Sequence, residues 1–424
     1  MEAAEVKQKC SKQIMISKKQ AKIMAFPYSK YDAIICDGAV RSGKTSIMTV
    51  SFIDWAMRCF NGCRFGICGK TVDSASKNIV VPFLSMSRAK ERYTLRWRRA
   101  DKVLEISRGY VKNYFEVFGG KDESSFALIQ GRTLAGVLLD EVVLMPRSFV
   151  EQALTRCSVD GAKVWFSCNP EGPEHWFYKE WIKRRQEHNA LYLHFEMTDN
   201  PSLSPKTLER YRSMFSGVFY NRYVRGLWVM AEGLIYDMFD PDANTYTDEQ
   251  APPSLHFSGT RTIACDYGTT NPTVFLDIYD YDGTIYVDRE YRWDSREEHR
   301  QKTDEEYADD MEEFIHGDQC AIIVDPSAAS FIAALRRRGL YVIPADNEVL
   351  DGIRRTATLF QSRKLLVNKS CAPLIGELGT YLWDEKSCKL GVDKPLKERD
   401  HGADALRYFS NSLPDWRFEV VQTK

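Results

Sequence analysis

What this sequence lacks already excludes several classes of protein. None of its apolar runs approaches the length of a membrane span, and its first residues lack the apolar core of a secretory signal. Its 11 cysteines are scattered, with no C-x-x-C pair and no zinc-binding spacing, which argues against a disulfide framework or a structural zinc site. We therefore expect a protein of the reducing cytoplasm that contacts no membrane.

The overall charge points to no particular partner. The chain has 58 Lys and Arg against 59 Asp and Glu, a formal net charge of −1, so global charge does not indicate a nucleic-acid partner. Basic residues cluster at 88–99 and 336–338, but such runs are most often the solvated face of a helix. They permit contact with DNA without demonstrating it.

The order of apolar and amphipathic segments indicates an α/β protein with two domains, which 424 residues can accommodate. In residues 1–235, short strand-like runs alternate with helix-like segments, the pattern of a mostly parallel sheet. Residues 236–258 are polar and proline-rich and are typical of a linker. Residues 259–424 begin with a strand followed by a hairpin and then return to alternating helices and strands.

The most informative motif is a complete phosphate-binding loop, GAVRSGKT, at residues 38–45. It follows the apolar run 33–36 and leads into a helix-like segment, the context in which backbone N–H groups converge on phosphate oxygens. Lys44 is expected to reach the β- and γ-phosphates, and Thr45 to place its hydroxyl on Mg²⁺. The loop residues expected to hold a nucleoside triphosphate are Gly38, Arg41, Ser42, Gly43, Lys44 and Thr45.

Two later strands end in polar residues that could complete a hydrolytic site. Asp140 and Glu141 follow an apolar strand, so Asp140 could hold Mg²⁺ and Glu141 could orient and deprotonate the attacking water. Asn169 ends the next strand. Its amide could sense the γ-phosphate or the water, or it could simply start a turn with Pro170.

Two residues near the loop have competing interpretations. The guanidinium of Arg41 could stabilise charge developing on the γ-phosphate, in cis or across a subunit boundary, or it could form a salt bridge on the loop's outer side. Gln20 precedes the loop, where its amide could read an adenine edge. The alternative for Gln20 is an exposed helix glutamine.

Three aspartates of the second half lie at the ends of elements. Asp266 and Asp325 each follow an apolar strand, and Asp404 lies on the last helix-like segment. Carboxylates brought together from such positions suit two Mg²⁺ or Mn²⁺ ions, which stabilise the attacking and leaving oxygens of a phosphodiester. Taken singly, an aspartate at such a position is more often a cap or turn residue. Asp400 and His401 could add a ligand or shuttle a proton, or could simply begin the helix.

Together these motifs make the chain resemble the large terminase subunits, the genome-packaging ATPase–nucleases of tailed bacteriophages or prophages. The resemblance covers nearly the whole length. It rests on GAVRSGKT, VLLDE and SCNP, on the stretch RGLWVMAEGLIY at residues 225–236, and on CDYGTTNP, IIVDPS and RDHGADALRY. The stretch 225–236 and the closing D-A-L-R-Y are the most distinctive parts.

The resemblance implies an ASCE-type P-loop ATPase domain followed by an RNase H-like nuclease domain. It implies that Lys44, Thr45 and Asp140 bind ATP with Mg²⁺, that Glu141 is the catalytic base, and that Asn169 couples hydrolysis to movement. Arg41 matches an arginine that this family often carries in the loop.

For the second domain, the resemblance implies that Asp266, Asp325 and Asp404 form the nuclease metal triad. His401 matches a histidine seen near that triad in some members. Two Mg²⁺ or Mn²⁺ ions are the expected cofactors of this site.

The implied partners are double-stranded DNA, the capsid portal protein and the small terminase subunit. The resemblance also implies a homo-oligomeric ring during packaging, a monomer in solution, and action in the host cytoplasm while docked on the procapsid portal. Two alternatives stay open. One is a helicase–nuclease of DNA repair, which would need a second RecA-like domain that residues 255–424 do not show. The other is a nucleotide-dependent assembly protein whose nuclease fold is inert.

Overall fold

The computed structural model describes residues 16–269 and 271–418, which belong to two compact units. The first unit is made of three segments of the described chain: 16–170, 176–208 and 225–227. The second is made of the remaining segments: 171–175, 209–224 and 228–418. The chain therefore passes between the units several times. Within the described ranges no helix combines the length and the apolar character needed to cross a membrane.

The strands described in the first unit form one sheet in the order β3-β4-β5-β2-β6-β7-β1-β8. From β5 to β8, neighbours in this order run parallel, whereas β3, β4 and β5 form an antiparallel meander at one edge. The mostly parallel α/β sheet expected from the sequence is confirmed. The strands are β1 (Ala33–Gly38), β2 (Arg64–Gly69), β3 (Thr94–Arg98), β4 (Val103–Arg108), β5 (Val111–Gly119), β6 (Gly136–Leu139), β7 (Lys163–Ser167) and β8 (Ala190–Phe195).

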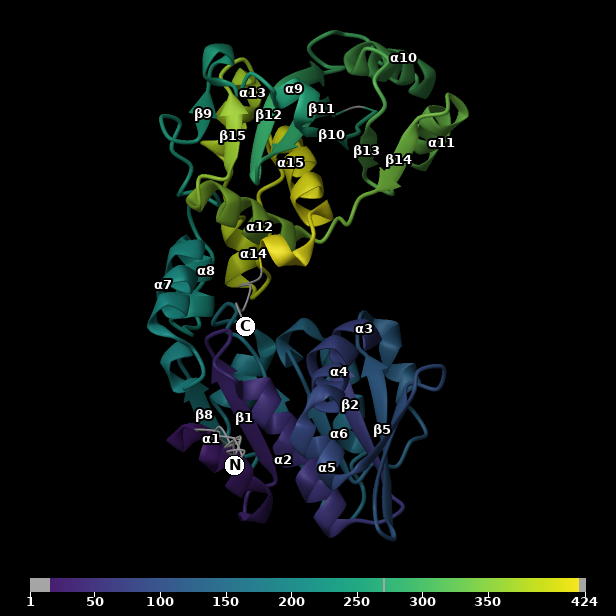
Figure 1. Ribbon diagram of the computed structural model, residues 1–424, viewed down its shortest axis with the longest axis vertical. Coiled ribbons are helices and arrows are strands. Elements are labelled where there is room, and N and C mark those ends of the chain that lie inside the picture. Colours follow the sequence, from purple (N-terminus) through teal and green to yellow (C-terminus); the bar gives the residue numbers. More distant parts are fainter. Residues whose placement is uncertain (1–15, 270, 419–424) are drawn as a thin grey trace, which may run out of the picture. The chain divides into compact units, whose positions relative to one another are not determined.

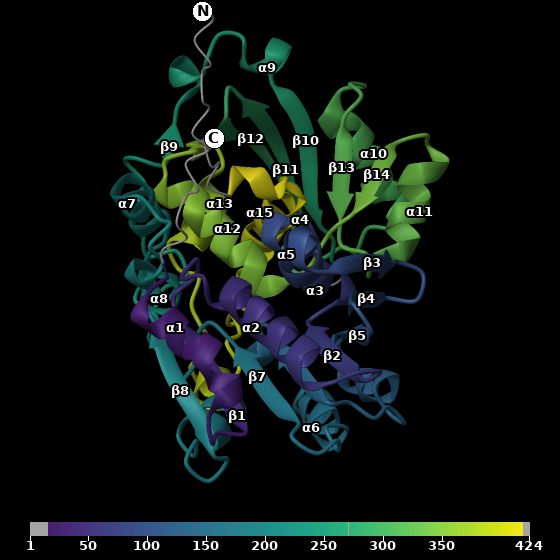
Figure 2. The same cartoon turned by 60° about the horizontal axis from the view of Figure 1, so that its bottom comes forward.

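Strand β1 and helix α2 carry the phosphate-binding loop between them. Every residue of β1 is buried, as expected for a central parallel strand that is covered on both faces. Helices α1 and α2 lie side by side, and α2 packs against β5, β6 and β7 (Figures 1 and 2). The helices in this part of the chain are α1 (Lys18–Ala25), α2 (Lys44–Cys59), α3 (Val72–Ala75), α4 (Val81–Ser85), α5 (Ser87–Arg92), α6 (Arg147–Thr155), α7 (Pro205–Met214) and α8 (Gly217–Phe219).

An aromatic cluster fixes α2 against the sheet. The rings of Phe52 and Trp55 on α2 lie 5.0 Å and 4.9 Å from the ring of Trp165 on β7. Phe65 on β2 and Phe115 on β5 stack at 5.1 Å beside them. All five side chains are buried, and aromatic pairs at such distances add to the stabilisation that burial provides. The helix that follows the loop therefore has little freedom to move relative to the strands that end beside it.

The strands described in the second unit form a mixed sheet in the order β14-β13-β10-β11-β12-β15-β9. Strand β11 runs antiparallel to β10 and β12, and the other neighbours run parallel. The strand followed by a hairpin that the sequence indicated is therefore present. The strands are β9 (Thr245–Tyr246), β10 (Thr260–Asp266), β11 (Thr273–Tyr281), β12 (Thr284–Trp293), β13 (Ala321–Val324), β14 (Tyr341–Pro344) and β15 (Leu365–Asn368).

Helices cover both faces of this second sheet. Ile263 and Cys265 of β10 belong to the same apolar core as residues of α10 and α11. Strand residues alternate between faces, so Asp266 points to the other face, where α15 packs against β10 and β11 (Figure 1). The helices are α9 (Leu255–Ser258), α10 (Asp304–Ile315), α11 (Ala329–Arg337), α12 (Val349–Gln361), α13 (Ala372–Leu378), α14 (Glu385–Lys389) and α15 (His401–Ser412).

The expectation that residues 236–258 form a linker is wrong. Within this segment, β9 pairs with β15 at the edge of the second sheet, and α9 packs against β11. Two buried polar side chains tie the segment down: Asn244 donates to the Phe360 carbonyl at 3.1 Å, and the Tyr246 hydroxyl donates to Asp288 at 2.9 Å. The polar composition that suggested a linker serves these internal hydrogen bonds. The domain boundary at residue 235 stays a prediction.

The second unit also contains a buried cluster of one arginine and two carboxylates. The Arg222 side chain is 2% exposed and lies 3.1 Å from Glu171, and it also contacts Asp393. Burial raises the pKa of Glu171 to about 7; Arg222 opposes this shift, whereas the charge of Asp393 and a hydrogen bond to it add to the shift. One guanidinium cannot neutralise two carboxylates, which agrees with the raised pKa of Glu171.

Candidate active sites

The phosphate-binding loop begins where backbone atoms leave no room for a side chain. Gly38 has a φ of +117°, and a Cβ at this position would lie 2.0 Å from the carbonyl oxygen of Phe195 on β8. The next N–H, that of Ala39, donates to the same oxygen at 2.8 Å. Only glycine fits this turn, and the start of the loop is held against β8.

Lys44 connects the loop to the end of β7. Its Nζ donates to the carbonyl oxygens of Gly38 at 2.9 Å and Ala39 at 2.8 Å, and to the side-chain oxygen of Asn169 at 3.2 Å. Burial lowers the pKa of Lys44. The structure therefore brings Asn169 to the loop, because the carboxyl ends of β1 and β7 are neighbours in a parallel sheet.

Asp140 lies beside Thr45 and is held by three donors. Its Oδ1 accepts a hydrogen bond from the Thr45 hydroxyl at 2.8 Å and another from the Ser167 hydroxyl. Its Oδ2 accepts from Asn78 Nδ2 at 3.3 Å. A hydroxyl and a buried carboxylate side by side are the hard oxygen ligands that a Mg²⁺–nucleotide requires, so these residues fit the expected metal.

Arg41 and Glu141 share an unusual backbone conformation. Their φ values are +57° and +55°, in the left-handed region that costs a non-glycine residue energy and that is common at functional sites. The Arg41 side chain is exposed, and its carbonyl accepts from Asn200 Nδ2 at 2.7 Å. Glu141 is half-buried at the start of a short 3₁₀ turn. The catalytic roles of both stay predictions.

Gln20 is not an exposed helix residue, because only 4% of it is accessible. Its side-chain oxygen accepts from the Ser17 N–H at 3.0 Å in a capping box at the start of α1. Its Nε2 lies against Gly43, where an added Cβ would be 2.8 Å away. The amide therefore borders the loop, and reading of adenine by Gln20 stays a prediction. Ser42 is buried, and its hydroxyl has no hydrogen-bond partner within the described part of the chain.

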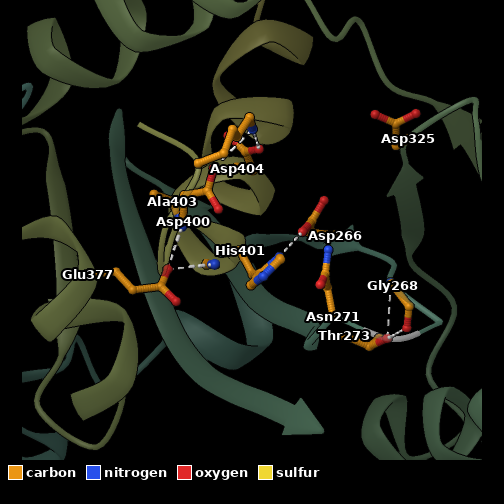
Figure 3. A network of polar contacts seen from close by, with 12 residues as sticks. Asp266, Gly268, Asn271, Thr273, Asp325, Glu377, Asp400, His401, Ala403 and Asp404 are labelled. Atoms are coloured by element: carbon orange, nitrogen blue, oxygen red, sulfur yellow. Dashed lines mark hydrogen bonds and ion pairs between the residues drawn. The ribbon is translucent and has the colours of Figure 1, made fainter. Parts of the chain in front are cut away.

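The second candidate site begins with Asp266 and His401. Asp266 ends β10 and His401 begins α15; His401 Nδ1 lies 2.9 Å from Asp266 Oδ2 (Figure 3). Burial raises the pKa of Asp266 and the charge of Asp404 adds to this, although the hydrogen bond from His401 opposes both. Burial alone would lower the pKa of His401, but the hydrogen bond and charge of Asp266 raise it.

The Tyr408 hydroxyl connects two of the three predicted metal ligands. It lies 2.9 Å from Asp325 Oδ2 and 3.3 Å from Asp266 Oδ1. Asp325 also accepts from the Ser327 N–H at 2.7 Å. Partial burial by itself would raise the pKa of Asp325, but the hydrogen bonds from Ser327 and Tyr408 hold it below its usual range. Because a single hydroxyl contacts both, these two carboxylates face the same space.

Asp404 is paired with cations. Lys397 Nζ lies 2.6 Å from Asp404 Oδ2 and 3.0 Å from Asp400, and Arg407 Nε lies 3.1 Å from Asp404 Oδ1. In the described ranges, no three His, Cys, Asp or Glu side chains lie close enough together to hold one metal ion. The expected convergence of Asp266, Asp325 and Asp404 is thus only partial, because Lys397 and Arg407 occupy the oxygens of Asp404. The donor chemistry of the three carboxylates still fits Mg²⁺ or Mn²⁺.

A carboxylate from another helix orients α15. Glu377 on α13 accepts from the backbone N–H groups of Gly402 at 2.7 Å and Ala403 at 3.1 Å, as Figure 3 shows. Arg292 on β12 donates to the same carboxylate at 2.7 Å. These contacts set the direction in which His401 and Asp404 leave the helix.

Sequence reasoning missed several residues that shape the two sites. They contact the predicted site residues, or the residues next to them, without having been assigned a role themselves: Asn78, Ser167, Glu377, Lys397 and Tyr408. Ser167 and Tyr408 do lie inside motifs that the sequence singled out, so their position at a strand end and on the last helix was an available signal. The others carried none.

A phosphate loop with an adjoining Thr–Asp pair at the end of a parallel sheet makes the first unit a P-loop nucleotide-binding unit. Residues 35–240 match the family model "Terminase large subunit, T4likevirus-type, N-terminal". The large terminase of a thermophilic bacteriophage is 48% identical over 94% of this chain and 99% of its own, with a TM-score of 0.90. A structure of that same phage terminase in complex with ATP-gamma-S is 47% identical over the same shares, with a TM-score of 0.87.

A curated relative supports the same assignment. The large terminase subunit of Escherichia phage T5 is 27% identical over 336 residues, which are 74% of this chain and 72% of the T5 protein. The chain belongs to the large terminase family.

Proposed function

We propose that this chain is a DNA-packaging ATPase that also cuts DNA. Hydrolysis of ATP at the first site drives translocation of double-stranded DNA into the procapsid, and the second unit cuts concatemeric DNA in a metal-dependent reaction. In this proposal the chain acts as a ring on the capsid portal protein, together with the small terminase subunit, in the cytoplasm of a bacterial host. Membership of the large terminase family supports this assignment.

One observation carries the ATPase assignment: the 2.8 Å contact between Thr45 and Asp140 beside Lys44. Thr45 and Asp140 are the two ligands that a Mg²⁺–nucleotide needs, and the neighbouring Lys44 is the residue that binds its phosphates. The structures of the thermophilic phage terminase in complex with ADP and with ATP-gamma-S agree with this assignment.

The residues around the first site divide the chemistry of hydrolysis between them. Bound Mg²⁺, held by Thr45 and Asp140, would neutralise charge on the phosphate oxygens. Lys44 leaves the loop carbonyls to bind phosphate, and Glu141 orients and deprotonates the attacking water. Arg41, exposed on the loop, stabilises charge on the γ-phosphate. Because Asn169 contacts Lys44 at 3.2 Å, release of Lys44 changes the contact at the end of β7, which is how Asn169 couples hydrolysis to movement.

The nuclease assignment rests on the carboxylates of the second unit. Asp266, Asp325 and Asp404 would hold two Mg²⁺ or Mn²⁺ ions, which supply charge stabilisation for the attacking and leaving oxygens of a phosphodiester. Tyr408 orients Asp266 and Asp325 by hydrogen bonding to both. His401 is positioned by Asp266 to move a proton at the edge of this site.

Two variants test this division of labour. Glu141→Gln should abolish ATP hydrolysis and packaging while leaving Mn²⁺-dependent plasmid cleavage intact. Asp266→Asn should abolish cleavage and leave ATP hydrolysis intact, with Asp282→Asn, an exposed turn residue of the same unit, as the control. Loss of both activities in either variant would contradict two independent sites.

These assays, together with an assay of strand separation, distinguish the alternative functions. A wild-type chain that hydrolyses ATP but cleaves no plasmid with either metal would be an assembly protein with an inert nuclease fold. ATP-dependent strand separation without translocation of duplex DNA would indicate a helicase–nuclease.

A further inference from the structure

Residues 225–227 belong to the first unit, although the residues on either side of them belong to the second. They begin the stretch 225–236, one of the two most distinctive sequence motifs, for which the proposed function supplies no role. The middle residue, Gly226, is buried and has a φ of +70°. The contacts of Gly226 explain why these three residues pack with the first unit.

The reason is a close backbone approach to the phosphate-binding loop. A Cβ on Gly226 would lie 2.9 Å from the backbone nitrogen of Ala39 and 3.1 Å from the Cα of Gly38. These contacts are with the main chain, which cannot rotate away as a side chain can. Gly226 therefore rests directly on the first peptide of the loop.

The third neighbour of Gly226, a histidine side chain, is also held in place. The same Cβ would lie 2.9 Å from Cε1 of His194 on β8. His194 Nδ1 lies 3.0 Å from the fully buried Asp37, the residue that precedes Gly38. Turning the imidazole away from a larger side chain would break this contact with Asp37. A substitution at Gly226 thus transmits its strain to the loop.

We propose that Gly226 is a positioning residue of the nucleotide site, and this proposal rests on the proposed ATP-binding function. The peptide beneath it links Gly38 to Ala39, whose carbonyl oxygens both accept from Lys44. The same peptide is held to β8 through the hydrogen bond from Ala39 to Phe195. Gly226 and β8 together set where these carbonyls lie, and therefore from where Lys44 is released toward phosphate.

The chain offers a matched control for this role. Gly233 lies in the same distinctive stretch and has a φ of +75°, but nothing lies within 4 Å of the position of its Cβ. Alanine at either position meets the same unfavourable backbone conformation. Only alanine at 226 also meets the loop, so comparing Gly226→Ala with Gly233→Ala isolates the contact from the backbone strain.

The test measures binding of ATP-gamma-S and the kcat and KM of ATP hydrolysis. Thermal unfolding checks that each variant folds, and Mn²⁺-dependent plasmid cleavage is the readout that a positioning role does not move. Gly226→Ala should bind ATP-gamma-S at least about tenfold more weakly than Gly233→Ala, because small misplacements of binding groups have large effects. Its midpoint of unfolding should lie below that of Gly233→Ala, because only alanine at 226 also meets the loop, but its plasmid cleavage should match that of Gly233→Ala. Equal affinity in the two variants would overturn the proposal.

A measurement on the wild-type chain keeps the proposal testable if Gly226→Ala does not fold. Hydrogen exchange of a peptide spanning residues 225–227 should change on addition of ATP-gamma-S, and that of a peptide centred on Gly233 should not. No change at residues 225–227 in a chain that binds ATP-gamma-S would overturn the positioning role alone. Failure of the wild-type chain to bind ATP-gamma-S would instead overturn the proposed function.

Discussion

The two candidate sites each lie at the start of a helix, and the two helices begin in opposite ways. The residue before α2 is Gly43, which has no side chain to cap the first turn, so no side chain of the N-cap residue bonds the first N–H groups of α2. The first turn of α15 is different, because Glu377 accepts from Gly402 and Ala403. The positive end of α2 is suited to an anion from outside the protein, whereas the positive end of α15 contacts the carboxylate of Glu377.

This difference explains what each site can bind. A helix start without an internal carboxylate is suited to phosphate, which agrees with Lys44 and Thr45 beside it. At α15 the internal carboxylate already satisfies the helix, so Asp266, Asp325 and Asp404 add negative charge that cations must balance. In the structure, Lys397 and Arg407 balance part of it. The first site therefore suits an anion, and the metal ions proposed for the second site would balance its negative charge.

Removing the central cation of the first site should have the largest effect. Lys44→Ala deletes the group that bridges the loop carbonyls and Asn169, so we expect ATP hydrolysis to fall by at least about 100-fold. Phosphate release measures this, with Lys121→Ala, an exposed lysine of the same unit, as the control. Plasmid cleavage should be unchanged; a parallel loss of cleavage would show that the two sites are not independent.

Glu171 is a buried carboxylate outside both sites, and its ionisation should change the stability of the fold with pH. Its folded pKa of about 7 lies above the ordinary value of 4.5, so between these values the folded chain holds a proton that the unfolded chain releases. The stability this proton provides is fully present below pH 4.5 and is lost as pH rises through 7. Relative to Glu171→Gln, the wild-type free energy of unfolding should fall by about 2 kcal/mol between pH 5 and pH 8.

Denaturant unfolding at the two pH values measures this change, with the exposed Glu209→Gln as the control. ATP hydrolysis and plasmid cleavage at constant pH should be unaffected by Glu171→Gln. If the free energy of unfolding changes between the two pH values by the same amount in the wild type and in Glu171→Gln, Glu171 is already ionised in the folded chain.

Tyr408 tests whether a hydroxyl organises the second site as Thr45 and Ser167 organise the first. Tyr408→Phe keeps the ring and removes the only atom that contacts both Asp266 and Asp325 among the described contacts. The Mn²⁺ concentration needed for half-maximal cleavage should rise about tenfold, the usual effect of removing an outer hydrogen bond to metal ligands. ATP hydrolysis should not change. An unchanged metal dependence would show that the carboxylates need no such organiser.

The smallest effect should come from the cap of α15. Glu377→Gln keeps the shape of the acceptor but removes its charge, so we expect the free energy of unfolding to fall by about 1 kcal/mol. Glu385→Gln, at the exposed start of α14, is the control. If the free energy of unfolding falls equally in the two variants, the charge of Glu377 does not stabilise the start of α15, and this difference from α2 is lost.

The first site could be predicted further from the sequence than the second, for a physical reason. The loop at 38–45 is contiguous, and its neighbours Asp140 and Asn169 follow apolar strands whose ends must meet in a parallel sheet. Asn78 approaches Asp140 from a segment that no motif marked. In the fold, the alternating pattern indicated the parallel sheet, but residues 236–258 were misjudged because polar residues also serve edge strands.

In the second site, each aspartate was predicted because it ends a strand or lies on the last helix, and its role stays a prediction. Their detailed arrangement could not be predicted, since it depends on Tyr408 and Glu377, which become neighbours of the site only after α13 and α15 pack. Lys397 is the clearest example: as one lysine in a charged segment it carries no signal, yet it is the closest partner of Asp404.

The buried cluster of Arg222 with Glu171 and Asp393 also has a consequence for the order of events during synthesis. Glu171 leaves the ribosome early, yet its burial needs a carboxylate and an arginine that are translated later. The first unit likewise waits for residues 225–227. Domains usually fold one after the other as they emerge. In this chain the first unit cannot reach its final packing until part of the second has been made, so its nucleotide site is completed only after residues 225–227 have been synthesised.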